Sequence, residues 1–286
     1  MNPYVIYTDS ACDIPAEMLK EWGVPFCELT FQFDDSEATY TNQDMSSEAF
    51  YQKMREGHIA KTAAANAEQF RAAFEEELKK GNDVLYLGFS SGLSTTYNCG
   101  RMAAEELAEA YPERKVLTVD TLSASAGFGL LLYLTLQKQK EGATIEEAFA
   151  FAEETRMHLC HWFTVDDLVY LKRGGRISPA VALLGGVLGI KPVLHMDDEG
   201  HLISMSKVRG RKAALKALAD KFNELALDKN GTIFISHGDC MEDVETLKEM
   251  LAAYGGEVDR VVFVGSVIGA HSGPGTMALF FVGKER

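Results

Sequence analysis

The segment Val84-Leu85-Tyr86-Leu87 runs directly into Gly88-Phe89-Ser90-Ser91-Gly92-Leu93-Ser94-Thr95-Thr96-Tyr97, and helix-forming sequence follows from Met102. An apolar strand that turns into a helix through small and hydroxylated residues presents hydroxyls and unpaired backbone N–H groups to an anion. A second loop of this kind, Gly265–Thr276, follows the apolar run Val261–Val264. We therefore predict that the two loops converge on one acidic group.

Strand and helix signals alternate through the first half of the chain. Apolar runs predict strands, and periodic segments with capping residues predict helices between them. The predicted strands are Tyr4–Thr8, Pro25–Phe33, Val84–Phe89 and Val116–Asp120. The predicted helices are Pro15–Trp22, Ser47–Arg55, Ala67–Lys80, Thr95–Tyr111, Ala124–Gln139 and Ile145–His158. This alternation predicts a parallel sheet covered by helices on both faces, as in Rossmann-like α/β/α domains.

The pattern changes after His158. Two predicted strands, Lys191–Met196 and His201–Lys207, are joined by a short turn and should pair antiparallel. The remaining predictions are strands at Leu159–Val165, Thr232–Ser236, Val258–Val264 and Met277–Val282, and helices ending at Gly174 and covering Pro179–Leu188, Arg211–Ala226 and Glu242–Tyr254. We predict an α/β protein with two closely packed domains, an N-terminal α/β domain (1–158) and a C-terminal α+β domain with a mixed or antiparallel sheet (159–286).

Composition excludes several classes of function. The net charge of -14 argues against nucleic acid, because binding a phosphate backbone needs an excess of Lys and Arg. The longest apolar stretch, Ala180 to Leu194, contains Lys191 and is shorter than the roughly 20 residues of a membrane span, so we expect no stable membrane insertion. The first residues lack the pattern of a signal peptide, and the five cysteines suggest no disulfide framework. A cytoplasmic protein is expected.

The turn Gly88-Phe89-Ser90-Ser91-Gly92 also matches the G-x-S-x-G nucleophile elbow of serine hydrolases. Asp120 or Asp239, followed by His271, would complete the order of serine, acid and histidine, with Ser90 or Ser94 as the nucleophile. Few strands precede the turn, and the sequence has no His-Gly-Gly-Gly oxyanion segment. A serine hydrolase or esterase therefore remains the alternative function.

Other polar clusters favour binding over metal chemistry. The segment His158-Leu159-Cys160-His161 lacks a matching second pair of ligands, and we predict no metal. His271 lies between glycines in an irregular loop, where a titratable side chain usually approaches a ligand. Arg173 and Arg176 flank two glycines that bend an exposed backbone, an arrangement that suits a phosphate-bearing partner or a headgroup, and Arg209 belongs to a second basic segment.

Seven motifs occur in an order that resembles one family: Tyr7-Thr8-Asp9-Ser10, Lys61-Thr62, Ser90–Tyr97, Val119-Asp120-Thr121, Leu171–Ser178, Lys191-Pro192 and His271–Gly275. These motifs are similar to those of the DegV proteins, bacterial carriers that bind fatty acids. The resemblance implies a two-domain α/β protein that holds one long-chain fatty acid, such as palmitate, stearate or oleate, and needs no other cofactor.

The resemblance also implies roles for single residues. Thr62 and Ser94, with the neighbouring Thr95, would bind the carboxylate, and His271 would lie at the same end. Members of the family present the acid to a separate dihydroxyacetone-kinase-like subunit, which uses ATP to form an acyl phosphate; the carrier itself is not an enzyme. The chain departs from the common pattern at Ala63-Ala64-Ala65 and at Thr95, where many members have Ser-Gln-Pro and Gly.

The acyl chain of such a ligand needs an apolar tunnel. The stretch Ala180 to Leu194, together with Phe280 and Phe281, supplies more apolar surface than a domain interface normally requires. We expect this surface to line the tunnel, near the interface between the two domains.

Overall fold

The computed structural model describes residues 3–178 and 189–286. In chain order, its first elements are β1 (Tyr4–Asp9), the 3₁₀ helix η1 (Ser10–Cys12), α1 (Ala16–Trp22), β2 (Phe26–Cys27), β3 (Thr30–Phe33), α2 (Ser47–Arg55), β4 (Ala60–Ala63), α3 (Ala67–Lys79), β5 (Asp83–Gly88), α4 (Thr96–Ala110), β6 (Val116–Asp120), α5 (Ser125–Lys140) and α6 (Ile145–Thr155). The others are η2 (Arg156–His158), β7 (Leu159–Thr164), α7 (Val169–Arg173), β8 (Ile190–Met196), β9 (Leu202–Arg209), α9 (Arg211–Leu225), β10 (Phe234–His237), α10 (Met241–Ala252), β11 (Arg260–Phe263), α11 (Ser266–Ser272) and β12 (Met277–Val282).

The first sheet is parallel and has the strand order β2-β1-β5-β6. All six residues of β5 are buried, as expected of a central strand that is covered on both faces. The segment that follows β5 forms the predicted turn, and α4 begins at Thr96. The alternation of strands and helices therefore predicted the parallel sheet of this half correctly.

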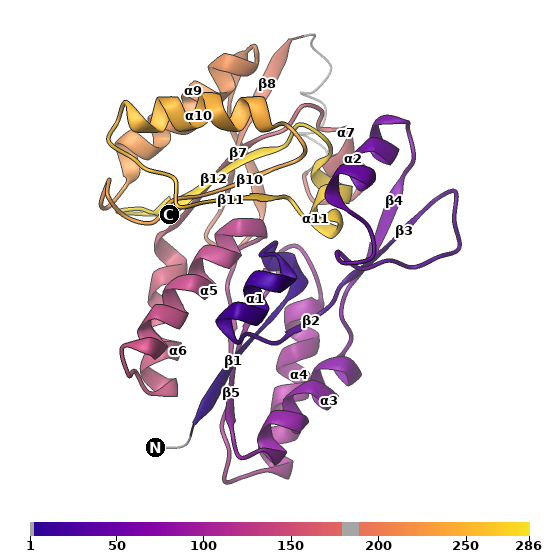
Figure 1. Cartoon of the computed structure of the whole chain (residues 1–286), viewed down its shortest axis with the longest axis vertical. Coiled ribbons are helices and arrows are strands. Elements are labelled where there is room, and N and C mark those ends of the chain that lie inside the picture. Colours follow the sequence, from indigo (N-terminus) through magenta and orange to yellow (C-terminus); the bar gives the residue numbers. More distant parts are fainter. Residues whose placement is uncertain (1–2, 179–188) are drawn as a thin grey trace.

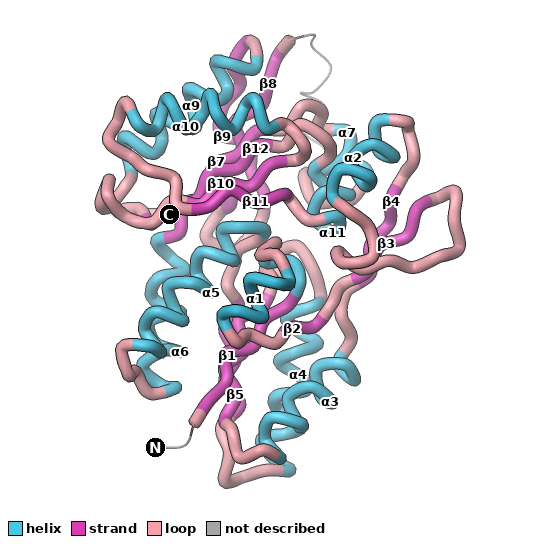
Figure 2. The backbone as a smooth tube through the Cα atoms, in the orientation of Figure 1, coloured by secondary structure: helices cyan, strands magenta, loops and turns pink. Residues whose placement is uncertain are grey.

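The strand predicted over Pro25–Phe33 is confirmed only in part, because the structure has two strands there, β2 and β3, which belong to different sheets. The backbone N–H of Leu29 donates a hydrogen bond to the Ser10 hydroxyl over 2.9 Å, and the chain leaves the parallel sheet at this point. Strand β3 then pairs antiparallel with β4, which the sequence analysis did not predict. Figure 2 shows this two-stranded sheet projecting beside α2 and α11.

The second sheet has six strands in the order β11-β10-β12-β7-β8-β9. Its strands pair antiparallel except for β10 and β11, which are parallel. The fold class predicted from sequence, a parallel-sheet α/β unit followed by an α+β unit with a mixed sheet, is confirmed. The helix predicted over Pro179–Leu188 lies outside the described residues.

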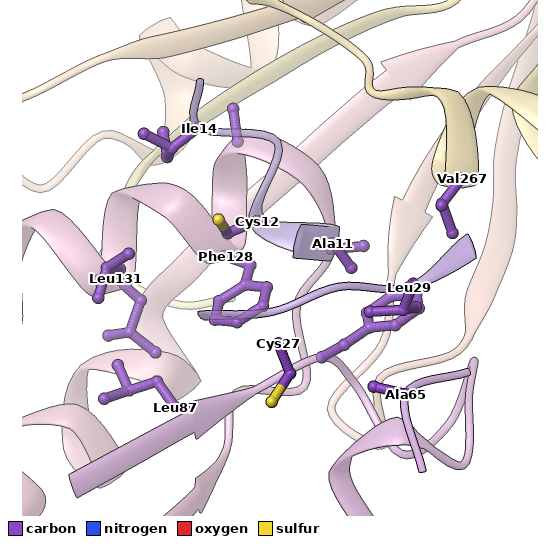
Figure 3. Close-up of a cluster of buried hydrophobic side chains, with 14 of the residues drawn as sticks. Ala11, Cys12, Ile14, Cys27, Leu29, Ala65, Leu87, Phe128, Leu131 and Val267 are labelled. Atoms are coloured by element: carbon purple, nitrogen blue, oxygen red, sulfur yellow. The ribbon is translucent and has the colours of Figure 1, made fainter. Parts of the chain in front are cut away.

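Helix α5 lies between the two sheets (Figure 1). Its first eight residues, Ser125–Leu132, are all buried, and none of them is charged. Phe128 and Leu131 join the large core that also contains Leu87 of the first sheet, and Val267 of α11 packs into the same core near Leu29 (Figure 3). One continuous core thus connects both sheets, and we propose His158 as the boundary between two tightly packed domains.

None of the helices in the described ranges combines the length and the apolar character needed to cross a membrane.

A buried polar cluster also joins the two halves of the chain. Asp13, which follows η1, accepts a hydrogen bond from the Ser125 hydroxyl over 2.5 Å, and the Ser125 and Ser236 hydroxyls are 2.9 Å apart. Burial raises the pKa of Asp13 from 3.8 to about 7. A carboxyl group with a raised pKa binds its proton more tightly in the folded state.

This cluster predicts a specific pH dependence of stability. The stabilisation from protonated Asp13 is fully present below pH 3.8 and is lost as the pH rises towards about 7. Between these values, the free energy of unfolding of the wild type relative to an Asp13→Asn variant should fall by up to roughly 1.4 kcal/mol per pH unit. Urea unfolding of both proteins between pH 5 and about 7.5 measures this difference; parallel curves would show that Asp13 is ionised throughout.

Candidate functional site

A cavity of about 520 Å³ opens between the two sheets. Its walls come from both halves of the chain: β4 and the turns before α4 and α5 on one side, and β7, β10, β12 and α11 on the other. The apolar part of the wall includes Leu29, Phe163, Met196, Val267, Ala278 and Phe280. A volume of this size is typical of a site for a small organic ligand.

The strands of the second sheet direct alternate side chains into the cavity. On β12, Ala278 and Phe280 line it, whereas Phe281 is buried on the other face and packs against Phe222 with ring centroids 5.3 Å apart. The prediction that both phenylalanines line the tunnel is therefore wrong for Phe281. The predicted lining by Ala180 to Leu194 falls largely outside the described residues, and Leu194 is buried in the core.

The polar end of the cavity is near the molecular surface. Thr62 and His271 meet there, with 2.8 Å between the threonine Oγ1 and the imidazole Nε2. Ser94 and the exposed Thr95 lie at the same end, where α4 begins, and all four line the cavity. The Thr95 side chain does not cap α4, and the helix begins here, so the positive end of its dipole lies at this end of the cavity.

Ser94 is positioned by its own turn. Its hydroxyl oxygen accepts a hydrogen bond from the Thr96 backbone N–H over 3.2 Å and lies 2.9 Å from the Thr96 hydroxyl. Of the four positions at which the sequence departs from the pattern of the family that it resembles, Ala63, Ala64 and Thr95 line the cavity, whereas Ala65 is buried in the core. These departures therefore change the surface of the cavity itself.

His271 is held neutral. Burial, together with the positive charge of Arg176, lowers its pKa from 6.5 to about 4. The ring lies on the short helix α11, so the prediction of an irregular loop at this position is wrong; the helix ends at Gly273, which has a φ of 83°. A Cβ on Gly174 would overlap the imidazole Nδ1, so the glycine is needed for the ring to fit.

Arg176 supplies a positive charge at this end of the cavity. Its Nε donates to the Leu93 carbonyl oxygen over 3.1 Å, and its Nη1 donates to the Gly174 carbonyl oxygen. The side chain is half-buried and lines the cavity, and burial lowers its pKa. Within the described ranges, no carboxylate forms an ion pair with it. A half-buried guanidinium without an acidic partner favours an anionic ligand.

The other two predicted arginines lie outside the cavity. Arg173 is exposed, and its guanidinium lies 5.7 Å from the centre of the Tyr170 ring. Arg209 is exposed at the end of the edge strand β9. These side chains are available to a partner.

The geometry does not assemble the hydrolase triad. Ser90 is fully buried, and its hydroxyl donates to the Gly200 carbonyl oxygen over 2.9 Å. The Asp120 carboxylate accepts from two backbone N–H groups, and Asp239 pairs with Arg55. His271 hydrogen-bonds to Thr62 and to neither candidate serine.

One group of metal-capable side chains occurs in residues 3–178 and 189–286, formed by Asp34, Asp35 and His58. It is largely exposed, and Lys53 already pairs with Asp35 over 2.7 Å. Nothing in this arrangement distinguishes it from an ordinary charged surface.

A family model described as "Uncharacterised protein, DegV family" matches residues 3–284. A DegV domain-containing protein of Clostridium perfringens is 44% identical and aligns over 100% of this chain and 99% of its own length. The chain belongs to the DegV family. DegV domain-containing proteins of Streptococcus pyogenes are 34% identical over 99% of both chains.

Solved DegV structures share the fold. A DegV protein of Thermus thermophilus, whose structure is described as showing fatty acid binding, has a TM-score of 0.87 and 31% identity, with 98% of this chain and 99% of that chain covered. A stearic acid-binding protein of Eubacterium ventriosum has a TM-score of 0.88 and 27% identity over 98% of both chains. The fatty acid binding DegV of Bacillus subtilis has a TM-score of 0.84 and 25% identity, covering 99% of this chain and 100% of its own.

The state of His271 can be tested directly. In protein stripped of lipid, its imidazole NMR signals should not titrate between pH 7 and about 5, because the pKa is about 4. An Arg176→Gln variant should raise this pKa by removing a like charge, yet leave it below 6.5, since burial is the larger cause. A wild-type midpoint near 6.5 would contradict the buried, neutral imidazole.

Proposed function

We propose that this protein binds one long-chain fatty acid with its carboxylate at Thr62, Ser94, Thr95 and His271. The observation that carries the proposal is Arg176, a half-buried cation without an acidic partner in the described ranges, at the polar end of an otherwise apolar cavity. A carboxylate would supply the missing negative charge and accept hydrogen bonds from the threonine and serine hydroxyls. DegV relatives of known structure bind fatty acids, which supports the same ligand class here.

The neutral His271 suits this role. Its Nδ1 is buried without a hydrogen-bond partner among the described residues, while its Nε2 faces the Thr62 hydroxyl. A neutral imidazole that donates from Nε2 keeps Thr62 free to donate its own proton to the carboxylate. The acid is thus bound by hydroxyls and a helix N-terminus, with Arg176 as the nearby positive charge.

The apolar wall accounts for the tail. Each CH₂ group moved from water into such a wall contributes about 0.8 kcal/mol, so affinity should rise with chain length until the cavity is full. We propose saturated or monounsaturated acids such as palmitate, stearate or oleate as ligands. The chain itself performs no covalent step, and no cofactor besides the bound acid is part of the proposal.

We further propose that the bound acid is presented to a separate ATP-dependent kinase in the cytoplasm. A carboxylate oxygen would attack the γ-phosphorus of ATP, the bond to the β-phosphate oxygen would break, and acyl phosphate and ADP would form. The site supports this role because its carboxylate end lies near the surface, at the exposed residue Thr95. The exposed Arg173 and Arg209 would contact the phosphate-bearing partner.

Thr62→Ala tests the carboxylate site. Mass spectrometry of an organic extract should find one fatty acid per wild-type protein and little in the variant, because the variant lacks one hydroxyl donor to the acid. Thr30→Ala is the matched control: Thr30 lies on the neighbouring strand β3, pairs with Ala63 and does not line the cavity. An empty wild type that also refuses added palmitate and oleate would refute the proposed function.

Variants of Arg176 and Arg173 should distinguish binding of the fatty acid from its presentation to the kinase. Arg176→Gln should weaken palmitate binding roughly tenfold or more, since the half-buried positive charge near the carboxylate is lost. Arg173→Gln should bind palmitate as the wild type does but slow acyl phosphate formation when a fatty acid kinase subunit and ATP are added. Equal rates for Arg173→Gln and the wild type would exclude Arg173 from the kinase contact.

A further inference from the structure

The deep end of the cavity contains a second polar region that the carboxylate site leaves unused. His161 lines the cavity and is only 2% exposed. Its Nδ1 lies 3.0 Å from the Leu159 carbonyl oxygen, which can only accept, so Nδ1 carries the proton and Nε2 is a bare acceptor. This Nε2 has no hydrogen-bond partner among the residues that the structure describes.

The unpaired imidazole nitrogen faces the start of α5. A Cβ on Gly127, in the first turn of that helix, would overlap His161 Nε2. The N-cap residue is Ala124, which has no side chain that could cap the helix, and both Ala124 and Ser125 line the cavity. The first N–H groups of a helix have no partner within it, so donors and an unpaired acceptor occur together.

Two hydroxyl groups complete this region. Ser236 is fully buried, lines the cavity and lies 2.9 Å from the Ser125 hydroxyl. Ser125 in turn donates to Asp13. Ser125 and Gly127 are two residues apart on a helix, so their Cα atoms are about 5 Å apart. One oxygen atom can therefore reach the polar groups beside both residues.

The chemistry of this region selects a group that both donates and accepts. A hydroxyl can donate to His161 Nε2 while it accepts from a first-turn N–H of α5. Ser236 donates its own proton to Ser125, whose proton goes to Asp13, and so holds the start of this helix in place. A purely hydrocarbon tail would leave these groups buried without partners, which costs free energy. We propose that the deep end of the cavity binds a hydroxyl group carried by the acyl chain, so that the preferred ligand is a hydroxylated long-chain fatty acid.

The length of α11 sets the position of this hydroxyl along the chain. His271 is at the carboxylate end, and Gly265, which precedes the helix, lies beside Asp13. Six residues of helix separate them by about 9 Å, which is well short of an extended long-chain acid. The hydroxyl should therefore sit on a carbon in the middle of the chain, not at its end.

The test rests on the proposed function and compares stearic acid with hydroxystearic acids that carry the hydroxyl at successive mid-chain carbons. Calorimetric titration of lipid-free protein should show one isomer binding about threefold to tenfold more tightly than stearic acid, as one added hydrogen bond predicts. If neither stearic acid nor any hydroxy acid binds, the proposed function fails. If stearic acid binds at least as tightly as every isomer, a resident water occupies the region and this inference is overturned.

Variants assign the preference to named atoms. His161→Leu should abolish the preference for the hydroxy acid over stearic acid, while stearic acid itself binds as tightly as before or more tightly. Ser236→Ala should weaken the same preference. Ser123→Ala is the matched control, because Ser123 is equally buried near Ser125 but does not line the cavity. If His161→Leu does not fold, Ser236→Ala is the deciding variant. A preference for the hydroxy acid that is unchanged in the folded variants would contradict the assignment of the hydroxyl site to these residues.

Discussion

The burial of α5 between the two sheets is the constraint on which the rest of the structure depends. Its first half has only small and apolar side chains, so it can be surrounded by protein on every side. Gly127 and Gly129 allow close approach: added Cβ atoms there would collide with His161 and with Ile14. The cavity lies between the two sheets, and its deep end coincides with the start of this helix, where Ala124 and Ser125 line it.

Much of this architecture could be predicted from local sequence patterns. Apolar runs such as the one before Gly88, alternating with capped helices, correctly indicated the parallel sheet. The two segments that carry Ser94 and His271 line one cavity, as predicted. The pairing of β3 with β4 was missed, because it depends on contacts between residues that are distant in the sequence. The position of Phe281 was also missed, because the sequence does not show which face of β12 lines the cavity. His161 was considered only as a metal ligand; its alternation with Phe163 along β7 was the signal for its inward position.

The two ends of the cavity differ in the kind of polar group that they offer. At the surface, the half-buried Arg176 and the N-terminus of α4 provide positive potential, and the neutral His271 adds no charge of its own. At the deep end, Asp13 forms no ion pair within the described ranges, and His161 offers an unpaired acceptor nitrogen beside the first turn of α5. The two ends of the cavity therefore differ in electrostatic character, which supports the orientation that we propose for the acid, with its carboxylate at the surface.

The segment from Leu171 to Arg176 joins the interior of the cavity to the outer surface. Leu171 and Arg176 line the cavity, Gly174 packs against His271, and Arg173 projects into solvent. The Arg176 guanidinium donates to the Gly174 carbonyl oxygen, so the side chain that faces the cavity is bonded to the same short backbone segment that carries the exposed Arg173. In the function proposed above, the kinase contact at Arg173 would lie three residues from the cavity-lining Arg176, so acid binding and kinase docking would be coupled through a single short segment of the chain.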